Sequence, residues 1–272
     1  MNLALLIPCA VAFGAVIGSF LTVVADRVPE GRSINSPPSM CPNCGLRLGV
    51  RDLVPIVSWV ALRGRCRRCG VRIGLEPLLI ELANVAVWVA LALRFHGDLD
   101  AGTDSVALLP AYLVFGSTLV ALSAIDFRLH LLPREVTFVG LGLGSALLIV
   151  GALVIGEPER IWMAALGAAI AFAILWTIYT AASWRYGEGV GFGWGDVILS
   201  PLLGAFVGFL NPGVVPPAIF FGFILATVAT IPLLATRRAD GATALPFGPF
   251  LGLGALVALF VGQHFVDLVL AR

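Results

Sequence analysis

Lysine is absent from this chain of 272 residues, and charged residues of either sign are scarce. All 17 basic residues are arginine, charged side chains make up 12% of the sequence, and hydrophobic side chains make up 59%. A soluble domain of ordinary composition has about one quarter charged residues. This shortage of charge excludes an ordinary soluble protein and indicates an integral membrane protein.

A recognisable secretory signal is also missing. The apolar stretch from Leu3 to Val24 has no basic residue before it and no clear small-residue cleavage site after it, whereas a signal peptide has both. The stretch is long enough to cross a hydrocarbon core of about 30 Å. We therefore expect it to be retained as the first transmembrane helix.

Apolar segments of about 20 residues recur along the chain, as transmembrane helices require. They lie near 3–25, 78–95, 105–125, 136–155, 161–183, 197–211, 214–235 and 245–270. The sixth is short and contains Pro201, so a re-entrant pair with the seventh is an alternative. The sequence predicts an all-α integral membrane protein with about eight transmembrane helices.

Arginine is distributed unevenly between the predicted loops. Nine of the 17 arginines lie in the polar segment 26–77, which the positive-inside rule assigns to the cytoplasm. The other arginines expected on that side are Arg128, Arg134, Arg185, Arg237 and Arg238. This helix count places 14 arginines on the cytoplasmic side and three on the other side, and this uneven distribution supports the count. It also predicts that Asp126 and Asp196 both lie at the cytoplasmic face.

Four of the five cysteines form two pairs in this polar segment, Cys41 with Cys44 and Cys66 with Cys69. Two such pairs about 20 residues apart are typical of a tetrahedral zinc site. Two disulfides, or four unrelated thiols, are the alternatives, but disulfides are rare in the cytoplasm. We expect a structural Zn²⁺, because a closed four-thiolate shell leaves no position for water. Cys9 is expected to be a small buried residue.

Two carboxylates border apolar segments. Asp126 ends the run 111–125, and Asp196 follows Gly193 and Gly195 at the start of another run. An ionisable side chain at the edge of hydrocarbon is costly, so a functional role is the default hypothesis. The two glycines leave room beside Asp196 for close approach. Helix capping is the alternative for each acid, whereas a pair on different helices can share a proton and activate water.

Other polar residues near the predicted spans carry weaker signals. We expect Glu81, one turn into the second helix, to pair with an arginine of the polar segment. His130 is interpreted as a polar loop residue and Glu135 as a solvated interface residue. Asp267 and His264 are interpreted as an interface contact near the last helix.

The order of these motifs resembles that of the prepilin peptidases, or type IV leader peptidases, which are membrane aspartyl proteases of the Gly-x-Gly-Asp class. Each motif is weak alone, but the ordered set is specific and runs across nearly the whole chain. Besides the cysteine pairs, the matching features are Gly18-Ser19-Phe20-Leu21, Arg27-Val28-Pro29, Ser33-Ile34 with Pro37 and Ser39, Leu62-Arg63-Gly64-Arg65-Cys66, Pro77-Leu78 with Glu81-Leu82, Ile125-Asp126 with Leu132-Pro133, Gly193-Trp194-Gly195-Asp196 and Leu245-Pro246-Phe247-Gly248-Pro249.

The resemblance implies that Asp126 and Asp196 are the catalytic pair of an aspartic endopeptidase. We divide the chain into a first helix at 1–25, a cytoplasmic zinc-binding loop domain at 26–77 and a membrane peptidase domain at 78–272. The implied substrates are prepilins or pseudopilins, cut after a glycine at the cytoplasmic face of the bacterial inner membrane. Lipid is the other expected partner, and no nucleic acid is expected.

Many members of the family also N-methylate the new N-terminus with S-adenosylmethionine. This sequence contains no recognisable methyl-donor fold, so the second activity stays open at this stage. Three positions depart from the family pattern: Thr22 stands where Asn is usual, Arg134 where an acid or amide is usual, and Ile198 where Lys is usual. None of the three is an aspartate of the pair or a cysteine.

Two other classes of function are alternatives. A transporter or channel would use Asp126 and Asp196 to bind a cation or relay protons, and short broken helices fit that class. A pilus-assembly scaffold would use the cysteine-bearing loop to bind a partner, and the two acids would only cap helices.

Overall fold

The computed structural model describes residues 2–187, 193–235 and 246–270. Its long helices are α1 (Leu3–Arg27), α3 (Glu76–Arg94), α4 (Leu109–Leu129), α5 (Arg134–Val154), α6 (Arg160–Tyr186), α7 (Trp194–Leu210), α8 (Val215–Ala235) and α9 (Gly248–Leu270). Within these ranges only isolated β-bridges occur and no strand, which confirms the all-α prediction. Arg237, Arg238 and Arg272 lie outside the described residues.

The remaining elements are short. Helix α2 (Val57–Ala61) and the 3₁₀ turn η1 (Val50–Asp52) lie in the polar segment between α1 and α3. The turns η2 (Gly102–Asp104) and η3 (Val106–Leu108) precede α4, and η4 (Pro212–Val214) joins α7 to α8.

Seven of the long helices in the described ranges are long and apolar enough to cross a membrane. Helix α7 has 17 residues, roughly 25 Å, and it runs unbroken through Pro201. Arg160, at the start of α6, donates to the carbonyl oxygens of Phe209 and Leu210 at the end of α7. Because α6 and α7 pack along each other, α7 extends to the face where the spanning helix α6 begins. This geometry favours a crossing helix over a re-entrant pair.

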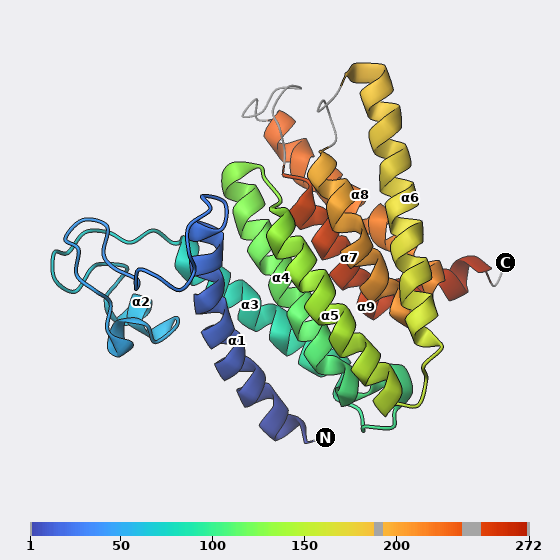
Figure 1. Cartoon of the computed structure of the whole chain (residues 1–272), viewed down its shortest axis with the longest axis horizontal. Helices are drawn as coiled ribbons and strands as arrows, with labels where there is room; N and C mark the ends of the chain where they lie inside the picture. The colour runs from blue at the N-terminus through green and yellow to red at the C-terminus, as the bar shows by residue number, and fades with distance from the viewer. Residues whose placement is uncertain (1, 188–192, 236–245, 271–272) are drawn as a thin grey trace.

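Helix α4 is the centre of the bundle. Figure 1 shows α4 and α5 in the middle, with α1 and α3 on one side and α6 to α9 on the other. Helix α4 packs against α1, α3, α5, α7 and α9. In its most apolar stretch 72% of the residues are buried, more than in any other of the seven spans. The segment 28–75 lies beyond α1, away from α6 to α9 (Figure 1).

Glycines allow the backbones of α6 and α7 to touch. A Cβ built on Gly204 would collide with the carbonyl oxygen of Gly167, and one on Gly208 would lie 2.6 Å from the Cα of Gly167. Small residues of this kind are how helices associate in lipid, where burial of apolar side chains gives little gain. Asp196 lies in the first turn of α7, so the contact between α6 and α7 helps to position that acid.

Two arginines outside the predicted cytoplasmic set pair with acids in the connections beside them. Arg94 pairs with Asp104, and Arg160 pairs with Glu157. These two arginines therefore add little net positive charge to their end of the bundle.

The expectation for Cys9 is wrong, because its side chain is exposed. Helix α1 packs on one side only, against α3 and α4, and just 22% of its apolar stretch is buried. Composition predicted the helix correctly, but it did not distinguish the face that meets lipid from the face that meets protein.

We expect Gly204→Ala to destabilise the protein by about 1–3 kcal/mol, because the added methyl group must displace the α6 backbone. Gly142→Ala is the matched control, since a Cβ at Gly142 meets nothing within 4 Å. The midpoint of thermal unfolding in detergent should fall only for Gly204→Ala. Equal midpoints for both variants and the unmodified protein would contradict the close α6–α7 contact.

Candidate active site and metal centre

Asp126 lies in the last turn of α4, and its residue is only 5% exposed. Its Oδ2 accepts a hydrogen bond of 3.1 Å from the backbone N–H of Gly248, the first residue of α9. A Cβ built on Gly248 would lie 3.0 Å from the same oxygen. The missing side chain therefore allows the positive end of the α9 dipole to approach the carboxylate.

Asp196 lies in the first turn of α7 and is also 5% exposed. Its Oδ1 is the only buried side-chain oxygen or nitrogen in the described part of the chain that has no hydrogen-bond partner. Leaving a buried polar atom unpaired costs about 1–3 kcal/mol. Such an atom is expected where water or a substrate group binds.

Asp126 and Asp196 are connected through one intervening side chain, that of Leu132. Leu132, in the α4–α5 connection, is 3.1 Å from a Cβ built on Gly195 and 3.0 Å from one built on Gly248. It therefore contacts both the neighbour of Asp196 and the residue bonded to Asp126. Helices α4, α7 and α9 pack against one another in pairs.

The four predicted metal ligands also converge. All four sulfur atoms lie within 4.8 Å of one another. The Cys41 and Cys69 sulfurs are 3.8 Å apart, and those of Cys44 and Cys66 are 3.9 Å apart. A tetrahedral shell with metal–sulfur distances of about 2.3 Å has sulfur–sulfur separations near 3.8 Å. The cluster can hold a metal ion.

Each cysteine pair is shaped by the same tight turn. Gly45 N–H donates to the carbonyl oxygen of Cys41, and Gly70 N–H donates to that of Cys66, both at 2.9 Å. Both glycines have positive φ, 66° and 70°, which residues with a side chain rarely adopt. The glycine after each pair is therefore required by the turn.

Backbone donors prepare some of these thiols to bind a cation. The backbone N–H of Val71, assisted by the side-chain amide of Asn43, lowers the pKa of Cys69 to about 6. Although the backbone N–H of Leu46 acts in the opposite direction, desolvation and the neighbouring sulfurs raise the pKa of Cys44 to about 11. A metal ion would hold both as thiolates, since its charge offsets their mutual repulsion.

Comparisons with known proteins show which sequences the chain is similar to. The Bacterial Peptidase A24 N-terminal domain matches residues 12–95, and the Type IV leader peptidase family matches residues 113–232. The "Prepilin leader peptidase/N-methyltransferase" of Pseudomonas putida is 31% identical, over 97% of this chain and 93% of the relative. Its namesake from Xanthomonas campestris pv. campestris is 32% identical, over 96% and 93%. The chain belongs to the type IV leader peptidase family. No solved structure matches it.

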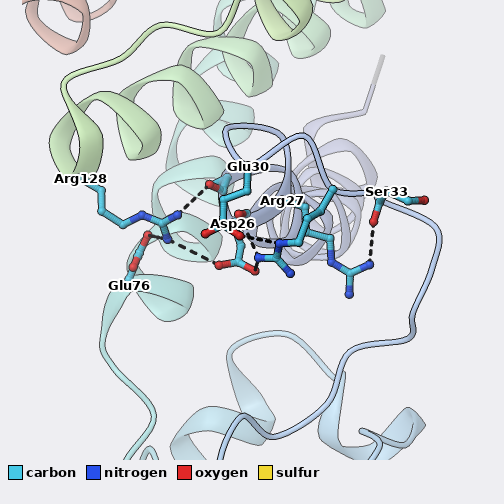
Figure 2. A network of polar contacts seen from close by, with 8 residues as sticks. Asp26, Arg27, Glu30, Ser33, Glu76 and Arg128 are labelled. Carbon is cyan, nitrogen blue, oxygen red and sulfur yellow. Dashed lines mark hydrogen bonds and ion pairs between the residues drawn. The ribbon is translucent and has the colours of Figure 1, made fainter.

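In this family member the last turn of α4 is held from two sides. Asp126 contacts α9, whereas Arg128 contacts α1 and α3 (Figure 2). The guanidinium of Arg128 donates to Glu76 Oε1 at 3.2 Å and to the carbonyl oxygen of Ala25 at 3.2 Å. It also lies 3.9 Å from Asp26. The sequence analysis did not predict this network. The signal that could have indicated it is an acid at the end of each of two neighbouring helices, Asp26 in α1 and Glu76 in α3.

A cavity of about 670 Å³ lies between the polar segment and the adjoining ends of α1, α3 and α4. Glu81 and Arg128 line it from the membrane helices, and Asp52 and Trp59 line it from the polar segment. The hydrogen bond from the Arg67 guanidinium lowers the pKa of Asp52. The volume is within the range of small-molecule sites, roughly 300–1,000 Å³. No local sequence pattern predicts the cavity, because distant segments form it.

The expectation that Glu81 pairs with an arginine is wrong for the part of the chain that the structure describes. Its Oε2 accepts a hydrogen bond of 2.6 Å from the backbone N–H of Ile56. Ile56 has a φ of 62°, and this backbone turn aims its amide at α3. The bond ties the polar segment to the membrane helices.

The other polar residues lie at the surface. His130 ends α4 in a left-handed conformation, and its N–H donates to the carbonyl oxygen of Asp126. Glu135 is exposed, and Asp267 accepts a hydrogen bond from the side chain of Gln263. None of the three side chains points to a further catalytic site.

We expect Asp126→Ala to lower the free energy of unfolding by about 1–3 kcal/mol, because it leaves the N–H of Gly248 buried without an acceptor. Asp126→Asn keeps an oxygen at that position and should unfold close to the unmodified protein. Thermal unfolding in detergent separates the two. A lower midpoint for the asparagine variant than for the alanine variant would show that the Gly248 contact does not stabilise the site.

Proposed function

We propose that this protein is a prepilin leader peptidase, an aspartic endopeptidase that removes the basic leader from type IV pilin-like precursors. The names of the curated relatives support this assignment. The observation that carries it is the pair of buried acids, Asp126 and Asp196, from the ends of two helices that pack together. One of them has a buried oxygen without a hydrogen-bond partner among the described residues.

The proposed mechanism divides two roles between the acids. The ionised carboxylate takes a proton from water while the protonated carboxyl donates a hydrogen bond to the scissile carbonyl. Water oxygen then bonds to the carbonyl carbon, the C–N bond breaks, and the leaving amine takes up a proton from the pair. The unpaired Oδ1 of Asp196 is suited to bind the water or the carbonyl. The two carboxyl groups titrate as a coupled pair, so the acid and base roles are not assigned to single residues.

The depth of the acids argues for a peptidase over a transporter. Asp126 is in the last turn of α4 and Asp196 in the first turn of α7, whereas a transporter would hold its ions near mid-depth. The arginine-rich segment 28–75 adjoins the same end of the bundle (Figure 1). In our proposal that end faces the cytoplasm, where the leader stays while the apolar helix of the substrate lies in the bilayer.

The proposal includes N-methylation of the new N-terminus, since the curated relatives are named for both activities. S-adenosylmethionine would supply an electrophilic methyl group on a sulfonium. The cavity has the volume for a ligand of this kind. Asp52 can accept hydrogen bonds from its hydroxyl groups, and the indole of Trp59 can contact its flat base.

The metal in our proposal is Zn²⁺, held by Cys41, Cys44, Cys66 and Cys69 in a structural role. Four sulfurs at tetrahedral separations leave no position for a reacting water. The ion would join the two halves of the polar segment, which forms one wall of the cavity. Metal binding would therefore support methylation more directly than cleavage.

Cleavage of a model prepilin by the purified protein in liposomes tests the peptidase. Asp126→Asn and Asp196→Asn should each reduce the rate by at least about 10³-fold, because each removes one half of the acid–base pair. Asp267→Asn makes the same chemical change at an exposed site on α9, and it should cleave normally. Near-normal cleavage by either of the first two variants would remove that aspartate from the mechanism and favour the scaffold alternative.

Elemental analysis of the purified protein tests the metal. We expect about one Zn²⁺ per chain, a large loss of zinc in Cys44→Ser, and no change in Cys9→Ser, whose cysteine lies on the exposed face of α1. Limited proteolysis of the Cys44→Ser protein should cut within the polar segment first. Undiminished metal content in that variant would exclude the four-thiolate site.

A further inference from the structure

Three of the four acids that line the cavity are paired with arginines. Asp26 and Glu76 lie beside Arg128, at 3.9 and 3.2 Å. Asp52 accepts a charge-assisted hydrogen bond of 2.7 Å from Arg67. Their charges are therefore largely compensated before any ligand binds.

The fourth acid, Glu81, differs from the others. It is 7% exposed, and within the described ranges no ion pair joins it to a cation. Its Oε2 receives the N–H of Ile56, but a carboxylate has about four acceptor positions. Five arginines also line the cavity, namely Arg27, Arg32, Arg65, Arg67 and Arg128, but no ion pair is found between any of them and Glu81 in the described ranges. A buried carboxylate without an ion-pair partner is costly, and a positively charged ligand group would compensate it.

Glu81 is also held rigidly. A Cβ built on Gly18 of α1 would lie 2.8 Å from the Cα of Glu81, so the two helix backbones are in contact there. The bond to Ile56 fixes the far end of the side chain. A site built on packed helices in this way binds a small group more precisely than a loop does.

The cavity lies next to the proposed cleavage site. Asp126 and Arg128 belong to the same last turn of α4, and two residues of an α-helix are separated by about 3 Å along its axis. Asp126 contacts α9 on the peptidase side, while Arg128 lines the cavity. The two side chains point to opposite faces of α4, so an N-terminus released at the aspartates is formed about one helix diameter, roughly 10 Å, from the wall that Arg128 contributes to the cavity.

We propose that Glu81 is the acceptor for the new N-terminal amine of the processed substrate, an inference that rests on the proposed function. An α-amine has a pKa near 8 and is largely protonated at neutral pH, so a carboxylate can bind it. In methylation, the ammonium group gives one proton to Glu81. The lone pair of the resulting amine nitrogen then bonds to the methyl carbon of S-adenosylmethionine. The bond between that carbon and sulfur breaks, and the electron pair of the broken bond stays on sulfur.

Binding of two peptides tests the amine site without catalysis. One peptide has the sequence of a processed pilin N-terminus with a free amine, and the other is the same peptide N-acetylated. The unmodified protein should bind the free amine at least about tenfold more tightly, as a charge-assisted hydrogen bond predicts. Equal binding of the two peptides would overturn the proposal, and this comparison requires no variant to fold.

Glu81→Gln removes the charge but keeps an oxygen that can accept the N–H of Ile56. We expect it to bind the two peptides within about twofold of each other and to cleave prepilin normally. The mass of the product's N-terminal peptide should show that methylation falls by at least about 30-fold. Glu135→Gln, the same change at an exposed acid outside the cavity, should behave like the unmodified protein in every assay.

Two outcomes separate the amine site from the proposed function. If Glu81→Gln methylates and discriminates the peptides like the unmodified protein, the role of Glu81 is wrong and the methyltransferase stands. If the unmodified protein prefers the free amine but methylates no prepilin, the amine site stands and the methyltransferase part of the function is wrong.

Discussion

The hydrogen bond from the N–H of Gly248 to Oδ2 of Asp126 joins the end of α4 to the start of α9, and the arrangement of the membrane helices depends on it. It favours a glycine at the first position of α9, since a Cβ there would lie only 3.0 Å from the carboxylate oxygen. The hydrogen bond also requires α7 to run to the opposite end of the bundle and α8 to run back, so that α9 begins at the end of the bundle where α4 ends. Leu132 fills the space between this contact and the start of α7, which brings Asp196 to the same site.

The last turn of α4 connects two sites with different chemistry. One side of the turn presents Asp126 to α7 and α9, where peptide hydrolysis is proposed. The other side presents Arg128 to α1, α3 and the cavity wall. A substrate whose bond is cut on one side would have its new N-terminus near the other. This arrangement gives a physical reason for cleavage and N-terminal modification to occur in one chain.

The features predicted correctly from the sequence are those with local signals. Apolar runs predicted the long helices, and the spacing of the cysteines predicted their convergence. The position of Asp126 and Asp196 at the ends of apolar runs predicted that they share one site, and this stays a prediction. The exposure of Cys9, the partner of Glu81 and the cavity were not predicted, because they depend on which helix faces pack and on the backbone turn at Ile56. The domain boundaries, the catalytic roles of the acids and the orientation in the membrane stay predictions.

Thiol cross-linking tests most directly whether the two acids share one site. Asp126→Cys and Asp196→Cys would be combined in a protein that lacks Cys9, treated in membranes with a short thiol-specific cross-linker, and digested for mass spectrometry. We predict efficient linkage of the peptides that contain positions 126 and 196. The control combines Asp126→Cys with Asp267→Cys, near the far end of α9, and should not link. Linkage of 126 to 196 no greater than in the control would contradict a shared active site.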